Sequence, residues 1–172
     1  MKKQDKLIFS SRIGFLFTAI FGSINHFIYK LSGRNPIIGA FVSVNESTWE
    51  HMKLLFFPYL IYTTAEWLIY GRKIDGFFFS RITGILIGLF MIPAIFYLYA
   101  GILGRNFAVV DILIFFAADA AAFYTSSRRI IHRIDHGTAK TISAVVIAVC
   151  LAVLFIGFTF FPPDSPLFRS PV

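Results

Sequence analysis

The sequence predicts an all-α, polytopic transmembrane helical bundle of about five spans, and three observations lead to that prediction. Of the 172 residues, 57% are apolar, 18% are aromatic and only 15% are charged, with a mean hydropathy of +0.74. Apolar runs of about 20 residues, the length that crosses a bilayer, recur along the chain. Lys and Arg fall in short clusters between these runs. A soluble domain of this size would leave much of this apolar surface in water, whereas lipid solvates it.

The distribution of the sixteen Lys and Arg residues predicts the orientation of the bundle. Eleven of them, Arg81 included, precede the first span or lie in the second-to-third and fourth-to-fifth connections, which face one side. Cytoplasmic loops carry the excess of Lys and Arg, so we expect the N-terminus inside and the C-terminus outside. The net charge of +7 then reflects topology, and we expect no nucleic-acid partner. The five cations on the opposite, outer side are Lys30, Arg34, Lys53, Arg105 and Arg169.

One membrane domain is expected over residues 1–172, because no Ser-, Gly- or Pro-rich linker divides the chain. Each apolar run is long enough to cross the hydrocarbon core as a helix with a rise of about 1.5 Å per residue. The predicted spans lie near residues 13–30, 54–70, 82–103, 107–125 and 141–161.

The first three spans carry small residues or prolines that shape helix packing. In the first span, Gly14, Thr18 and Gly22 recur every fourth position, and the same stripe reaches His26, which should therefore face protein. Pro58 in the second span frees a backbone carbonyl one turn earlier. The third span repeats both features, with a stripe at Gly84 and Gly88 and a proline at Pro93.

The last two spans differ in polarity. The fourth contains two carboxylates, Asp111 one turn inside its outer end and Asp119 two turns deeper. The fifth is an apolar run with an alanine stripe that includes Ala144 and Ala148. Carboxylates inside a span cost about 2.5–3.5 kcal/mol each on insertion scales, so they require a partner or a function.

A polar run before the second span holds more ionisable groups. Ser43 and Glu46 have the spacing of a capping box, which predicts that a helix begins there and gives Glu46 a structural role as an alternative to a site role. Glu50 lies one turn further along the same face, and its structural alternative is an ion pair with Lys53 at i+3.

Depth along the spans predicts a site at the outer face. His26, Glu50, His51 and Asp111 fall at one level, with Glu46 and Asn45 nearby. Imidazoles and carboxylates can ligate a metal or move a proton. The catalytic candidates are Glu50, His51, His26 and Asp111; the binding candidates are Glu46, Asn45 and Asp119; and the candidate ligands for a divalent metal are His26, His51, Glu50 and Asp111.

Asp119 and Glu66 form a deeper tier. Carboxylates at stepped depths are typical of a proton or cation pathway. The alternatives are that Asp119 bonds a Thr or Tyr of a neighbouring span, and that Glu66 lies in the interface beside Trp67 and Arg72.

The run Asn45-Glu-Ser-Thr-Trp-Glu-His-Met-Lys53, with His26 before it, resembles an uncharacterised family of small bacterial multi-span membrane proteins, a domain of unknown function. The resemblance extends to the closing segment from Phe161 to Arg169. It implies a membrane location and a multi-span fold, and it supplies no activity, cofactor or mechanism.

Three kinds of function fit these observations. The first is a membrane-embedded hydrolase or transferase that acts on a lipid-type substrate at the outer His/carboxylate site. The second is a small ion-coupled carrier or solute-binding protein that uses the outer tier and Asp119. The third is an accessory membrane subunit that binds a partner through its small-residue stripes. In each case we expect a multi-pass protein of the cell membrane, with the lipid bilayer as its partner; the substrate and the oligomeric state stay open.

Overall fold

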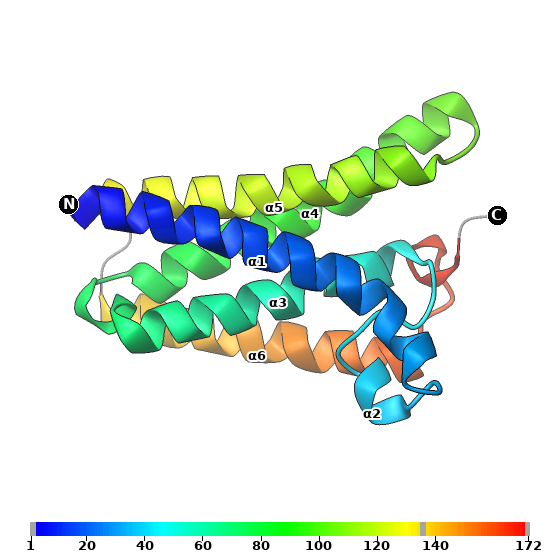
Figure 1. Cartoon of the computed structure of the whole chain (residues 1–172), viewed down its shortest axis with the longest axis horizontal. Coiled ribbons are helices and arrows are strands. Elements are labelled where there is room, and N and C mark those ends of the chain that lie inside the picture. Colours follow the sequence, from blue (N-terminus) through cyan, green and yellow to red (C-terminus); the bar gives the residue numbers. More distant parts are fainter. Residues whose placement is uncertain (1–2, 135–136, 171–172) are drawn as a thin grey trace.

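Every regular element of the described residues is a helix. A computed structural model describes residues 3–134 and 137–170, and no strand occurs among them. The short elements are α2 (Pro36–Gly39), η1 (Gly71–Lys73) and η2 (Pro166–Phe168). The five long helices, which lie roughly along one axis (Figure 1), are α1 (Lys3–Leu31), α3 (Thr48–Ile69), α4 (Phe77–Leu103), α5 (Ala108–Ile131) and α6 (Thr138–Phe160). The predicted all-α bundle is confirmed.

Four of the long helices are long and apolar enough to cross a membrane: α1 from Gln4 onward, α4, α5 and α6. The fifth long helix, α3, covers the predicted span near residues 54–70 but is not among the four. It carries three charged residues, Glu50 and Lys53 in its first two turns and Glu66 near its end. The fold is therefore compatible with an integral membrane protein in which α3 is the long helix that falls short of an apolar span.

Helix α3 lies at the centre of the bundle. Every residue from 53 to 59 is buried, which means that all sides of this part of the helix face protein. Helix α1 packs against α3 and α5, α4 packs along α5 and against α3, and α6 packs against α4 and α3. Figure 1 shows α3 between α1 and α6. A helix surrounded in this way can carry ionisable groups, because neighbouring helices shield them from lipid.

The outside of the bundle is apolar. Phe90 of α4 is 74% exposed, and large apolar side chains are exposed on the other apolar helices as well. Lipid chains would solvate such a surface, whereas water would not. Further examples are Phe27, Leu98, Val109, Leu113 and Val153.

The small-residue stripes pack inside this chain. A Cβ at Gly84 would lie 2.3 Å from the carbonyl oxygen of Ala122, so α4 and α5 touch at backbone distance there. A Cβ at Gly22 would lie 2.7 Å from the carbonyl oxygen of Leu54, so α1 also approaches the backbone of α3 closely. Ala144 of α6 is also fully buried. The stripes thus serve the contacts among the helices of one chain.

Two cations that the charge pattern predicts near loops are buried instead. Lys53 and Arg81 both have an exposed fraction of 0%. Each lies inside a long helix and forms an ion pair, Lys53 with Glu50 and Arg81 with Glu66. These two ion pairs mark opposite ends of the bundle, which we call the His26 end and the Arg81 end.

Candidate metal centre

The loop before α3 sets the position of the candidate site. Ser47 caps the helix, and its Oγ accepts a hydrogen bond from the backbone N–H of Glu50 at 3.3 Å. Asn45 supports the cap, since its Oδ1 accepts from the N–H of Ser47 at 2.8 Å. The predicted capping box of Ser43 and Glu46 is wrong, because the Ser43 hydroxyl donates to the carbonyl of Asn45 instead. The helix begins four residues later than a Ser43 cap implies. Glu46 therefore lies before the helix, and its side chain does not take part in capping.

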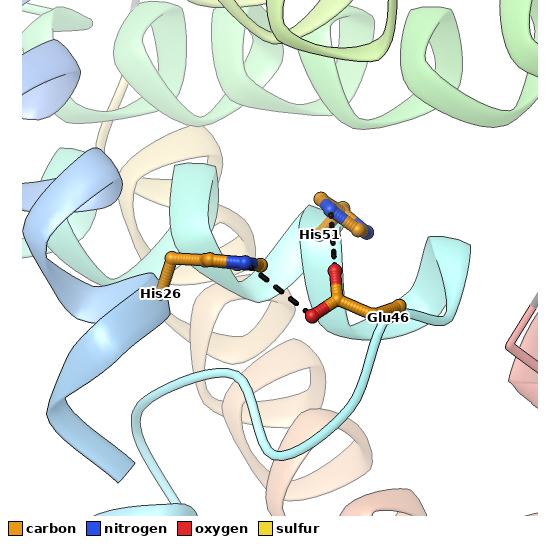
Figure 2. A group of neighbouring side chains, drawn as sticks. All are labelled: His26, Glu46 and His51. Carbon is orange, nitrogen blue, oxygen red and sulfur yellow. Dashed lines mark ion pairs between the residues drawn. The ribbon is translucent and has the colours of Figure 1, made fainter. Parts of the chain in front are cut away.

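Glu46 lies between two imidazoles. Its Oε1 is 3.4 Å from Nε2 of His26, and its Oε2 is 3.8 Å from Nε2 of His51. Figure 2 shows the carboxylate reaching toward both rings, with His26 coming from α1 and His51 from the first turn of α3. The exposed fractions of the side chains are 28% for His26, 30% for His51 and 54% for Glu46. The site is thus open to small ligands.

A backbone hydrogen bond orients the His51 ring. Its Nδ1 lies 2.9 Å from the carbonyl oxygen of Ser47. A carbonyl can only accept, so Nδ1 carries the proton and donates. The lone pair of Nε2 then faces the cluster. This arrangement, in which one ring nitrogen donates to a carbonyl and the other is available, is the usual one for a metal-binding histidine.

The donor atoms of this cluster fit a divalent metal. One ligand atom from each of His26, Glu46 and His51 can be chosen so that all three lie within 4.8 Å of one another. Metal bonds of about 2.0–2.2 Å in tetrahedral geometry separate neighbouring ligand atoms by about 3.3–3.6 Å. Each imidazole lies near this separation from one oxygen of Glu46, His26 at 3.4 Å from Oε1 and His51 at 3.8 Å from Oε2. Two imidazoles and a carboxylate are a ligand set of catalytic zinc, which leaves one coordination position open.

The open side of the cluster faces a pocket of about 480 Å³. His26, Glu46 and His51 stand at one wall, and Asp111 and Asn106 bring polar atoms from another. The remaining wall is mostly apolar and comes from α1, α3, α4 and α5. Its residues are Gly22, Ser23, Phe27, Thr48, Leu54, Ile92, Phe96, Ala108, Ile112, Ile114 and Phe115.

Asp111 is held in place across the pocket from the imidazoles. Tyr99 of α4 donates its hydroxyl to Oδ1 of Asp111, and Asn106 Nδ2 donates to Oδ2 at 3.2 Å. The Tyr99 hydroxyl in turn accepts from the N–H of Phe107 at 3.1 Å. Asp111 therefore lines the pocket without joining the three-residue cluster.

Glu50 does not line the pocket. It is 2% exposed and pairs with Lys53 at 2.9 Å, the i+3 ion pair that its structural alternative predicted. Its other partners are the N–H of Val44 and the hydroxyl of Thr159 on α6. Lys53 also donates to Thr159 and to the carbonyl of Gly39. This network fastens α2 and α6 to α3.

The deeper carboxylates are also separate from the pocket. Glu66 accepts two hydrogen bonds from Arg81, at 2.9 and 2.8 Å, together with one from Tyr70. It does not pair with Arg72, which lies over the Trp67 ring. Asp119 is fully buried, and neither of its carboxylate oxygens has a hydrogen-bond partner among the described residues.

Residue patterns did not identify three residues that contribute to this region: Ser47, Tyr99 and Asn106. Ser47 and Glu50 have the same S-x-x-E spacing as Ser43 and Glu46, so the true cap was visible as a second candidate. Asn106 and Tyr99 have no local signal, because the α4–α5 turn brings them to Asp111.

The fold and the site together define a class: a helical bundle of membrane type with a His/Glu cluster at the mouth of an apolar pocket. Within that class the chain belongs to a family of unknown function, DUF6512, which matches residues 1–172. This match confirms the resemblance to an uncharacterised domain family. Comparisons with curated proteins and with solved structures found no match.

Proposed function

We propose that this protein is a multi-pass protein of the cell membrane that binds a divalent metal at His26, Glu46 and His51 and catalyses hydrolysis or group transfer on a lipid-type substrate. One observation carries the proposal: three metal-ligand groups from separate segments converge within 4.8 Å at the wall of an apolar pocket. An open coordination position beside such a pocket suits catalysis better than a purely structural metal.

The pocket suits an amphipathic substrate. Its volume of about 480 Å³ is in the range of ordinary ligand sites. Apolar groups of Leu54, Ile92 and Phe115 would contact a hydrocarbon part, while the polar group of the substrate reaches the cluster. Because α1, α4 and α5, which line the pocket together with α3, are apolar enough to face lipid, the bilayer can supply such a molecule directly.

Each residue then has a distinct task. His26, Glu46 and His51 hold the metal, and Ser47 fixes the His51 ring through its carbonyl. A divalent metal held there would supply an activated water and a positive charge for the developing oxyanion. Asp111, on the facing wall and positioned by Tyr99 and Asn106, exchanges a proton with the reacting water or the leaving group.

Metal titration of the purified protein tests the first half of the proposal. In detergent or nanodiscs, after removal of metals with a chelator, Zn²⁺ should bind by calorimetry with a stoichiometry of one. His26→Ala, His51→Ala and Glu46→Gln should each weaken binding by more than the roughly 10- to 100-fold typical for loss of a supporting residue. His132→Ala removes an exposed imidazole near the Arg81 end and should leave binding unchanged.

The second half requires a substrate screen. The metal-loaded protein is incubated with a total lipid extract, and products are identified by mass spectrometry. Glu46→Gln and His51→Ala should abolish product formation, while Asp111→Asn should lower turnover and leave Zn²⁺ affinity unchanged. If His26→Ala, His51→Ala and Glu46→Gln all still bind Zn²⁺ with unchanged affinity, the proposed metal site is wrong.

A second candidate, an ion-coupled carrier, is favoured by the carboxylate of Asp119, which is fully buried and has no hydrogen-bond partner among the residues that the structure describes. It requires substrate-dependent proton or cation movement in proteoliposomes, and Asp119→Asn should stop that movement. The accessory-subunit alternative has less support, because the small-residue stripes that were to bind a partner are occupied within the chain.

A further inference from the structure

Asp119 occupies an electrostatically demanding position. Its exposed fraction is 0%, and both carboxylate oxygens are without hydrogen-bond partners among the described residues. Nearly all buried polar groups in proteins are hydrogen-bonded, and an ionised carboxylate inside a membrane helix is costly without a partner. A bound proton or cation that neutralises the Asp119 carboxylate is therefore required at this position.

Helix register places a second unsatisfied group opposite Asp119. On α1, the space beside Gly14 is filled by Phe123, and the space beside Gly22 is filled by Phe115. Thr18 lies midway between the two glycines, and Asp119 lies midway between the two phenylalanines. The Thr18 hydroxyl is also fully buried and also has no hydrogen-bond partner in the described part of the chain. The α1–α5 interface thus holds a hydroxyl and a carboxyl at one level, both unpaired.

Within residues 3–134 and 137–170, the neighbouring helices bring no cation within hydrogen-bond distance of Asp119. From α3, Tyr59 is near enough to interact electrostatically, but its hydroxyl donates to the Arg81 carbonyl and to Ser126. From α4, Gly84 and Gly88 pack on the backbone of α5 at this level. The guanidinium of Arg81 interacts with Glu66, Ser126, Ser127 and Ser11. A proton is the neutralising cation that needs no further ligands.

Asp119 lies close to the pocket. Phe115, one turn before it on the same face of α5, lines the pocket, as does Leu54. The four-residue step from Phe115 to Asp119 corresponds to about 6 Å along the axis. On its other side, Tyr59 and Ser126 lead to the Arg81–Glu66 pair. The carboxyl therefore stands between the pocket and the polar network at the Arg81 end.

We propose that Asp119, opposite Thr18, is a buried proton-binding site that exchanges its proton with the pocket. In the proton-bound state the neutral carboxyl lies at the level of the Thr18 hydroxyl without a hydrogen bond to it, as in the structure. On release, its O–H bond breaks, the proton passes to a water molecule at the pocket floor, and the Thr18 hydroxyl donates to the carboxylate that remains. This site stands independently of the metal centre, since none of the three metal-ligand candidates takes part.

Infrared difference spectroscopy of the full chain in nanodiscs tests the proposal. We expect a carbonyl stretching band of a protonated carboxylic acid that disappears as the pH is raised. The band should be lost in Asp119→Asn and retained in Asp164→Asn, which changes an exposed carboxylate in the C-terminal segment. A band that does not respond to pH, or that persists in Asp119→Asn, would overturn the proposal.

Two further measurements keep the test decisive. Thr18→Val is nearly isosteric and should shift the frequency of the band, because the carboxyl loses its hydroxyl neighbour; an unshifted band contradicts the Thr18 contact. If Asp119→Asn does not fold, isotope-labelled aspartate in the unmodified protein identifies the band. Adding Na⁺ at constant pH should leave the band unchanged, whereas its loss would assign the site to sodium and overturn the proton assignment.

Discussion

The two ends of the bundle each hold ionisable side chains, and the two clusters differ in burial and in hydrogen bonding. At the Arg81 end, the guanidinium is 0% exposed and donates to Glu66 and to three serines from α1 and α5. At the His26 end, Glu46 is 54% exposed and approaches two imidazoles at 3.4 and 3.8 Å beside a pocket.

This contrast distinguishes a structural ion cluster from a candidate binding site in the same molecule. The Arg81 cluster satisfies its members from four helices, so it has no capacity left for a ligand. The His26 cluster keeps lone pairs directed at open space. The buried charges of the Arg81 cluster are fully paired, and this pairing fixes the positions of the helices. The side chains of the His26 cluster are only partly paired and lie next to a cavity, so a metal can still bind there.

The largest expected effect comes from breaking the Arg81 cluster. Arg81→Leu leaves Glu66 buried without its counter-charge, and loss of one partner of a buried pair typically costs about 3–5 kcal/mol. Thermal unfolding in detergent should show a large drop in stability. Arg128→Leu, which removes an exposed cation, is the control and should change little. Equal effects of the two substitutions would contradict the structural role of Arg81.

The two glutamates Glu46 and Glu50 give the sharpest test of the contrast. Glu50→Gln leaves the buried Lys53 charge unpaired and should cost about 3–5 kcal/mol. Glu46→Gln changes an exposed side chain and should alter stability by less than about 0.5 kcal/mol. Only Glu46→Gln should reduce Zn²⁺ affinity in a protein that still folds. If Glu50→Gln instead reduced Zn²⁺ affinity and Glu46→Gln did not, Glu50 and not Glu46 would be the metal ligand.

A smaller effect is expected from the close contact of α4 and α5. Gly84→Ala places a Cβ 2.3 Å from a backbone oxygen, and such overpacking typically costs about 1–3 kcal/mol. Gly101→Ala, where a Cβ meets nothing within 4 Å, is the matched control. Unfolding midpoints of the two variants should separate, and coincident midpoints would contradict the backbone contact.

The smallest effect concerns the start of α3. Ser47→Ala removes the cap and should cost about 0.5–2 kcal/mol, while Ser43→Ala should cost less because Ser43 does not cap the helix. Circular dichroism during thermal unfolding compares the two. If Ser43→Ala is the more destabilising, the helix begins where the rejected capping box placed it.

Much of the fold could be predicted because it depends on local patterns. Apolar run length predicts the helices, and depth along them brings His26, His51 and Asp111 to one pocket. Local sequence could not show which of Glu46 and Glu50 lies at the start of the helix and which lies at the site, since both follow a serine with capping-box spacing. The partner that completes the burial of Glu50, Thr159, lies 109 residues away.

The polar partners at the Arg81 end illustrate the same limit. Charge statistics treat Lys and Arg near span ends as loop residues. Arg81 instead lies inside α4, where Ser11 from 70 residues earlier and Ser126 from 45 residues later reach it. No periodicity within one helix indicates that three others will supply hydrogen-bond partners.

The polar character of α3 has a consequence for the biosynthesis of the protein. An isolated helix with Glu50, Lys53 and Glu66 partitions poorly into lipid, because each charge opposes insertion. The hydroxyl that joins the Glu50–Lys53 pair belongs to Thr159, 106 residues after Lys53 and near the end of the last helix. We therefore expect α3 to settle among its neighbours only after the ribosome has completed α6, so that a chain truncated before Thr138 would leave its central helix exposed to quality-control proteases.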